Sequence, residues 1–223
     1  LYSSAASDVY KRQIYYDADK NFLPTDVSEP SLLKLWSTIH EGVNASFTSN
    51  SNAYDNVSEW KNLADNGNKW VKLAANQGAE VFRNYHDFKG IRFTGESGGD
   101  AFKLQDTGGD PAVITLDQSS NGFTICFIAT NEAMDSGATL FGSLANDDSA
   151  LIWQDTDIIR FRAGGVNVDF SYSPSLNDET FHSIMIVQES GGTVKLYINN
   201  GEAATATSTE DFEFSMLGGN NNT

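Results

Sequence analysis

The sequence contains a single cysteine, Cys126, so no disulfide can form within the chain. Cys126 lies in the apolar run FTICFIA, residues 123–129, and this context predicts a buried and unreactive thiol. A chain of 223 residues is long enough to bury a core without covalent links. We therefore expect one domain that is stabilised by packing.

Basic residues are also scarce: 14 Lys and Arg stand against 30 Asp and Glu, for a formal net charge of −16. A surface of this sign repels phosphate backbones and no Lys/Arg cluster offsets it, which argues against a nucleic-acid partner. No apolar run approaches the roughly 20 residues that a membrane-spanning helix requires. The acidity fits a protein that is extracellular, at a cell surface or on a virion.

The first residues of the chain do not resemble part of a domain. Residues 3–13, SSAASDVYKRQ, resemble the in-frame translation of a transposon-type sequencing adapter. We interpret residues 1–13 as adapter-derived and do not assign them to the domain. Residues 14–30 are acidic and rich in turn formers, which indicates a linker or the tail of an upstream region. The domain itself is assigned to residues 31–223.

The clearest structural signal is a hairpin at residues 181–201. Apolar residues alternate along both of its arms: Ile184, Ile186, Val194, Leu196 and Ile198. Gly191 and Gly192 lie between the arms, where a tight turn needs the positive φ that glycine adopts without steric cost. Asn199-Asn200-Gly201 marks a second sharp turn directly afterwards.

Similar short runs recur about every 8–12 residues, a spacing typical of a β-sandwich or barrel. The expected strands are residues 70–73, 90–94, 101–104, 112–116, 123–130, 138–142, 150–153, 158–162, 166–172, 202–207 and 212–217. Residues 123–130 are apolar at both parities, which predicts a central strand covered on both faces. Residues 42–56 have the composition of a Ser/Asn-rich loop, and residues 31–40 fit either a helix or a short strand.

Five short motifs follow one another along the chain. They are Leu35-Trp36 with Val57-Ser58-Glu59-Trp60, Gly90 to Gly95, Glu179 to Val187, Leu196 to Gly201, and Phe212 to Gly219. In this order they resemble the concanavalin A-like lectin/glucanase superfamily, and more narrowly the laminin-G-like domains of bacterial and phage surface proteins. The resemblance implies an all-β jelly roll of two antiparallel sheets. In that family a further strand follows the last motif, so the resemblance also implies a truncated C-terminus and an unpaired sheet edge.

Glycoside hydrolases of this superfamily carry three acids on one strand, and retaining hydrolysis needs two carboxyl groups about 5 Å apart. The chain has no such string of acids. The pairs Asp155/Asp157 and Asp211/Glu213 alternate but lack a third acid, and we interpret them as solvated strand-end residues. His182 lies on a hairpin strand, where a structural role is the simplest interpretation. The sequence therefore predicts no catalytic residues and no enzyme.

Carbohydrate binding combines aromatic faces with amide and carboxylate hydrogen bonds. Trp153, Tyr172 and Tyr197 are the candidate carbohydrate-binding residues, because each lies on an expected strand and Tyr197 has the opposite parity to its apolar neighbours. Candidate ligands for Ca²⁺ flank the strand of Trp153 and could meet at one end of the sandwich: Asp147, Asp148, Asp155 and Asp157. Solvated turns explain these aspartates equally well.

These patterns favour a non-catalytic carbohydrate-binding or adhesion module of a larger secreted or virion-surface protein. Its expected partner is a glycan, or a protein of a cell surface or virion. Two alternatives stay open: a glycoside hydrolase of the same superfamily, and a structural spacer of a phage fibre or adhesin.

The interpretation of residues 3–13 predicts that they are not encoded at the gene's own locus. Sequencing that locus from independently prepared DNA should give a different reading frame in this region. Codons for SSAASDVYKRQ at the locus would show that the segment is natural.

Overall fold

The computed structural model describes residues 43–45, 54–62, 67–73, 80–85, 88–93, 101–118, 122–129, 137–155, 157–172 and 181–219. The predictions for residues 1–30 and 31–40 lie outside these ranges. The described residues form seventeen strands, which all pair antiparallel. None of them belongs to a helix long and apolar enough to cross a membrane.

All of these strands are short, between two and eight residues long. In chain order they are β1 (Val43–Ala45), β2 (Tyr54–Lys61), β3 (Lys69–Lys72), β4 (Glu80–Tyr85), β5 (Phe88–Arg92), β6 (Phe102–Gln105), β7 (Ile114–Leu116), β8 (Phe123–Ala129), β9 (Ala138–Gly142), β10 (Ala150–Asp155), β11 (Ile158–Ala163), β12 (Val166–Ser171), β13 (His182–Gln188), β14 (Thr193–Ile198), β15 (Gly201–Thr207), β16 (Phe212–Phe214) and β17 (Met216–Leu217).

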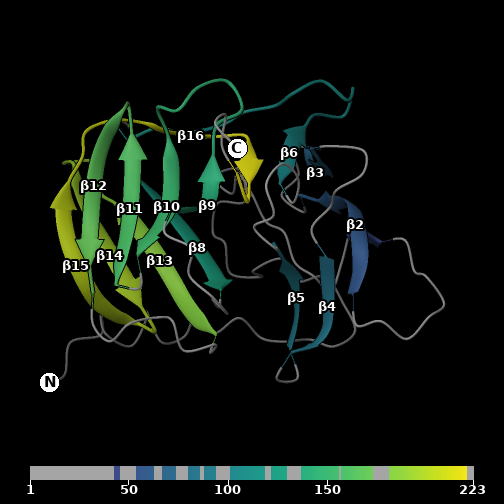
Figure 1. The fold of residues 1–223 in the computed structure, drawn as a ribbon. Coiled ribbons are helices and arrows are strands. Elements are labelled where there is room, and N and C mark those ends of the chain that lie inside the picture. Colours follow the sequence, from purple (N-terminus) through teal and green to yellow (C-terminus); the bar gives the residue numbers. More distant parts are fainter. Residues whose placement is uncertain are drawn as a thin grey trace, which may run out of the picture.

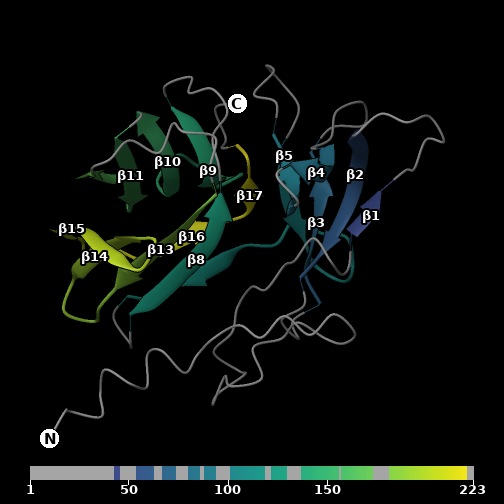
Figure 2. The same cartoon turned by 90° about the horizontal axis from the view of Figure 1, so that it is seen from below.

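The strands are arranged in two main sheets and one two-stranded ribbon. The large sheet has the order β12-β11-β10-β9-β17-β6-β3-β2-β4-β5, with β1 paired to β2. The small sheet has the order β15-β14-β13-β8, and the ribbon joins β16 to β7. Figures 1 and 2 show β9 to β12 as one layer and the small sheet as a second layer that faces it. The expected class, an all-β sandwich of antiparallel sheets, is confirmed.

The core lies between these layers and follows the period-2 alternation of the strands. On the large sheet, Ile159, Phe161 and Ala163 of β11 are fully buried, while the residues between them are only partly buried. On the small sheet the inward residues are equally inaccessible: Ile184, Ile186, Val194 and Leu196. Removal of these side chains from water is the main stabilising contribution of the sandwich.

The segment from Phe212 to Leu217 connects the layers. The Phe212 ring packs on Phe161 of the large sheet, with centroids 5.1 Å apart, and on Phe123 of the small sheet at 6.3 Å. After β16 the chain enters the large sheet as β17, between β9 and β6. The single strand predicted at residues 212–217 is therefore wrong: it is two short strands in different sheets, separated by Ser215.

The tight turns form where the sequence predicts them. Gly192 has φ of 85°, and an added Cβ there would lie 3.2 Å from the Ser208 carbonyl oxygen, so both conformation and space require glycine. In the second turn Asn199 and Asn200 have φ of 50° and 69°. Asparagine is one of the few residues that tolerate this region, and a two-residue turn of this kind matches the twist of the flanking strands.

Two other predictions are wrong. The expected loop at residues 42–56 contains β1 and the start of β2, and β4 was not expected at all. The strand at residues 123–130 is not central: in the described part of the chain β8 pairs only with β13, and Thr124, Cys126 and Ile128 are exposed. Apolar residues at both parities suggested a strand covered on both faces, but Cys126 and Ile128 lie on an open face.

Replacement of Phe212 should reveal how strongly the connecting segment stabilises the fold. We expect Phe212→Ala to lower the free energy of unfolding by about 3–5 kcal/mol, because the ring is fully buried and a cavity would remain. Urea unfolding followed by far-UV circular dichroism measures this loss. The matched control is Val113→Ala, whose side chain is 49% exposed and should cost under about 1 kcal/mol. Equal losses of unfolding free energy in the two variants would contradict the stabilising role of Phe212 between the layers.

Candidate functional site

The outer face of the small sheet brings together side chains from four strands. The inward residues of these strands are buried in the core or partly buried against it, so their neighbours along each strand point outward. The register places four outward residues in one row across the sheet: Cys126, Met185, Tyr197 and Glu202. The adjacent row contains Thr124, Val187, Lys195 and Thr205. We call these two rows the Tyr197 face.

Tyr197 lies between a carboxylate and an ammonium group on this face. Its hydroxyl donates to Glu202 Oε2 at 3.4 Å, and Thr205 Oγ1 donates to the other oxygen, Glu202 Oε1, at 3.0 Å. On the same strand, Lys195 Nζ donates to Glu189 Oε1 at 2.7 Å. The ring therefore lies next to oriented hydrogen-bonding groups of both kinds.

The electrostatics fix the protonation states at neutral pH. The hydrogen bond to Glu189, together with its charge, raises the pKa of Lys195, so the ammonium form is favoured. Desolvation, and then the charge of Glu202, raise the pKa of Tyr197, so its hydroxyl stays protonated and can donate. The face thus offers a neutral ring, a carboxylate acceptor and a cationic donor.

Of these residues only Tyr197 is a sequence candidate, and its outward orientation is confirmed. Glu202 was not a sequence candidate, although the Asn199-Asn200 turn determines its position opposite Tyr197. A two-residue turn pairs residue 198 with residue 201, and residue 197 then pairs with residue 202. Met185 and Cys126 follow from the register of the next two strands, which the sequence does not specify.

Cys126 lies at the edge of this face, and the prediction that it is buried is wrong. Its sulfur is nevertheless partly desolvated by its surroundings, and this raises the pKa of the thiol. A raised pKa leaves less of the reactive thiolate at neutral pH. Low reactivity of Cys126 therefore stays a prediction, which now depends on the raised pKa and not on burial.

The other two aromatic candidates face into the core. Trp153 is 2% exposed and Tyr172 is 7% exposed. Trp153 Nε1 donates to the Tyr172 hydroxyl at 3.0 Å, so each ring satisfies the polar atom of the other. Neither ring has a face open to a ligand, and both act in packing.

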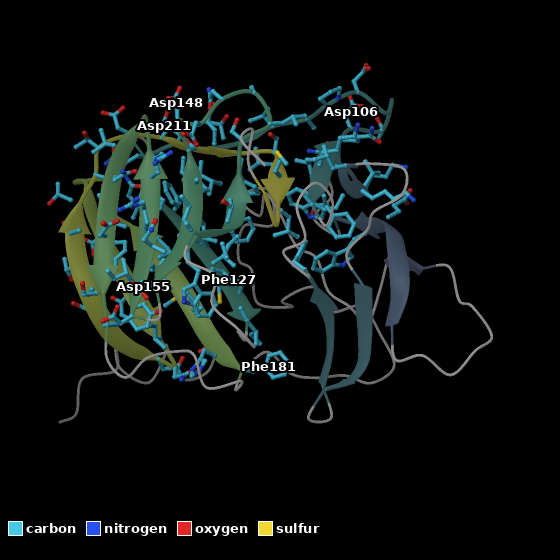
Figure 3. The ribbon with its side chains drawn as sticks, viewed as in Figure 1. Asp106, Phe127, Asp148, Asp155, Phe181 and Asp211 are labelled. Carbon is cyan, nitrogen blue, oxygen red and sulfur yellow. The ribbon has the colours of Figure 1, made fainter. Side chains whose placement is uncertain are left out.

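The candidate calcium ligands are not brought together. Asp147 and Asp148 precede β10, whereas Asp155 ends this strand and Asp157 follows it. Figure 3 shows Asp148 and Asp155 at opposite ends of the sheet. A six-residue strand separates its ends by roughly 17 Å, so one ion cannot contact both pairs. Among the described residues no group of three or more His, Cys, Asp or Glu side chains is arranged to hold a metal ion.

A second polar surface lies on the outer face of the large sheet. Arg160 forms a two-point interaction with Asp169, through Nε to Oδ1 at 2.6 Å and Nη2 to Oδ2 at 2.8 Å. Arg162 Nε donates to Asn167 Oδ1 at 2.6 Å, and its Nη1 lies 2.8 Å from Asp147 Oδ2. The hydrogen bond from Arg160 lowers the pKa of Asp169. These groups hold one another in place across neighbouring strands.

The remaining acidic and histidine candidates have structural contacts. Asp211 Oδ1 accepts from the backbone N–H of Gln118 at 2.8 Å, and Glu213 Oε1 accepts from Thr115 Oγ1 at 3.2 Å. His182 is buried, and Asn199 Nδ2 donates to its Nδ1 at 2.9 Å. This bond connects the start of β13 to the turn after β14, which matches the structural role expected for His182.

No protein-family model matches the chain, and no curated protein matches its sequence. Among solved structures, the binding domain of Paraclostridial Mosquitocidal Protein 1 is similar with a TM-score of 0.52 and 16% identity over 79% of this chain. The chain spans 44% of the length of that protein's chain. At such identity the likeness shows the fold alone.

Two further likenesses are weaker. Carbohydrate-binding module CBM66 from Bacillus subtilis has a TM-score of 0.39 and 13% identity, over 66% of this chain and 85% of that one. A Bacillus licheniformis β-glucanase has a TM-score of 0.26 and 9% identity, over 80% of each chain. Neither bears on what this chain binds.

The Trp153–Tyr172 pair predicts a pH dependence of stability. Burial raises the pKa of Tyr172 to about 12, against about 10 for an unfolded tyrosine; the hydrogen bond from Trp153 opposes this shift, and the charges of Asp157 and Asp155 add to it. In the folded state Tyr172 keeps its proton to a higher pH than in the unfolded state. Its contribution to the free energy of unfolding is therefore complete below pH 10 and is lost as pH rises from 10 to 12. Two pKa units correspond to about 2.7 kcal/mol at most.

Urea unfolding at pH 9, 10 and 11 measures this effect as the difference between the wild-type protein and Tyr172→Phe. The variant should be less stable at pH 9, because the Trp153 donor loses its acceptor, and the gap should narrow with rising pH. Two curves that stay parallel across this range would contradict the raised pKa.

Proposed function

We propose that this chain is a non-catalytic carbohydrate-binding module and that its ligand lies on the Tyr197 face. The observation that carries the proposal is the partly exposed Tyr197 ring between the Glu202 carboxylate and the Lys195 ammonium group. The likeness to solved structures contributes only the fold.

The chemistry of this face matches the needs of a sugar. The apolar C–H patch of a pyranose or furanose ring packs on an aromatic face, and its hydroxyls form hydrogen bonds with carboxylate and ammonium groups. Tyr197 supplies the first element, and Glu202 and Lys195 supply the second. Met185 and Val187, on the neighbouring strand, extend the apolar floor of the face.

The finer assignment is a laminin-G-like domain of a secreted or virion-surface protein with an adhesive role. It rests on the five motifs in order and on the net charge of −16, which keeps such a surface soluble. In the described strands the motif Leu196 to Gly201 forms the end of β14, the turn and the start of β15, as expected.

The two alternatives make different predictions. A glycoside hydrolase would release reducing sugar from a β-glucan and would need two carboxyl groups about 5 Å apart. A structural spacer would bind no glycan at all. Screening on an array of immobilised plant, microbial and animal glycans, followed by a reducing-sugar assay on β-glucan, separates all three.

Replacement of Tyr197 tests the site directly. Tyr197→Ala should weaken binding to the best glycan on the array by at least about tenfold, a loss of about 1.4 kcal/mol, because the stacking surface is removed. Isothermal titration with that glycan in solution gives the dissociation constants. Tyr197→Phe should retain most of the affinity, because it removes only the hydroxyl.

The matched control is Val166→Ala, which shortens an apolar side chain, 53% exposed, on the edge strand of the opposite sheet. Its affinity should equal that of the wild-type protein. Loss of binding in this control, or full binding by a folded Tyr197→Ala variant, would exclude the Tyr197 face as the site.

A further inference from the structure

The hydrogen-bond pattern of the small sheet shows which backbone groups of β8 point away from β13. The backbone N–H of Asn199 donates to the backbone carbonyl of Ser183 at 2.9 Å, so the backbone groups of Ser183 point toward β14. Backbone groups alternate in direction along an antiparallel strand, and the alternate residues of β13 therefore bond to β8. Their partners in the register are Phe123, Ile125, Phe127 and Ala129.

It follows that Thr124, Cys126 and Ile128 direct their N–H and C=O groups away from β13. Among the described strands none pairs with β8 on that side. Natural sheet edges are protected by charges, proline or bulges. Residues 123–129 contain neither a charged residue nor a proline, and the Ile128 side chain is 69% exposed.

This edge is also uncharged, on a chain of net charge −16. The outward residues of β8 and of its neighbour are all neutral: Thr124, Cys126, Ile128, Ser183, Met185 and Val187. Two copies of the chain repel each other over most of their surfaces. They can approach closely where both are uncharged and where each directs backbone groups that no described strand pairs with.

We propose that β8 pairs antiparallel with β8 of a second copy about a two-fold axis through Cys126. Cys126 is the midpoint of the seven-residue strand, so the symmetric register places it opposite its own copy and places Thr124 opposite Ile128. All three residues with outward backbone groups then lie in hydrogen-bonded pairs, two bonds to each pair. The interface is isologous, as closed dimers require.

The pairing creates a sheet of eight strands from two four-stranded ones. It covers the Ile128 side chains and continues the Tyr197 face from one copy to the other through Met185 and Cys126. A single strand pair buries little surface, so the dimer should dissociate on dilution.

Sedimentation velocity across a hundredfold range of protein concentration tests the proposal. The wild-type chain should shift from monomer to dimer as concentration rises. Ile128→Lys should stay monomeric at every concentration, because it places a charge on each side of the axis. The matched control Val166→Lys adds the same charge at a 53% exposed valine of β12 and should dimerise like the wild-type protein.

Cys126 gives a second and independent measurement of the register. Because it is the only thiol, a short bismaleimide should link two chains through Cys126 alone, most rapidly at mildly alkaline pH. We expect a covalent dimer from the wild-type protein and Val166→Lys, and at least tenfold less from Ile128→Lys. Thr124→Lys serves the same purpose if Ile128→Lys does not fold.

Three results would overturn the proposal. They are a wild-type chain that stays monomeric throughout the range, equal dimerisation of Ile128→Lys and Val166→Lys, and slow hydrogen exchange of the Thr124, Cys126 and Ile128 amides in the monomer. The last result would mean that another part of the same chain already covers the edge.

Discussion

The packing of Phe212 and Phe214 between the sheets is the contact on which the rest of the structure depends. Phe212 contacts rings of both layers, and Phe214 continues the contact to Phe141, at 5.6 Å, and to Trp70, at 6.3 Å. A ring of this size buries enough apolar area to contribute several kcal/mol, and edge and offset contacts between rings add to it. Without these rings a cavity would remain in the core between the two layers.

The same packing determines what the surface can offer. When Ile184, Ile186 and Leu196 are fixed in the core, the strand period forces Met185, Val187 and Tyr197 outward. The proposed glycan site therefore needs no loop to position it. Tyr197 and Lys195 lie on β14, whose backbone pairs with β13 on one side and with β15 on the other, and such sites are more rigid than those on loops.

Much of the fold follows from local sequence signals. The hairpin from β13 to β14, its turns and the outward orientation of Tyr197 depend on period and glycine or asparagine placement, which are properties of neighbouring residues. Trp153 could not be placed in the same way. Residues 150–153 are all buried, so parity does not distinguish a core face from a ligand face in that strand.

Two of the errors share a physical cause: they depend on partners that are distant in sequence. The exposure of β8 is a property of its place at a sheet edge, and the break at Ser215 reflects a change of sheet. The separation of Asp148 from Asp155 is set by which strand lies between them. The ion pair of Arg160 with Asp169 depends on the register of β11 and β12. The Gly164-Gly165 turn determines this register.

The position of β17 has a consequence for how the molecule is made. This short strand is among the last described residues of the chain, yet it pairs with β9 on one side and β6 on the other. The hairpins from β9 to β12 are formed by sequence neighbours and can fold early, whereas the junction with β6 requires a contact between distant residues. During synthesis the large sheet therefore exists as two separate parts, each with an open edge, until residue 217 has been added.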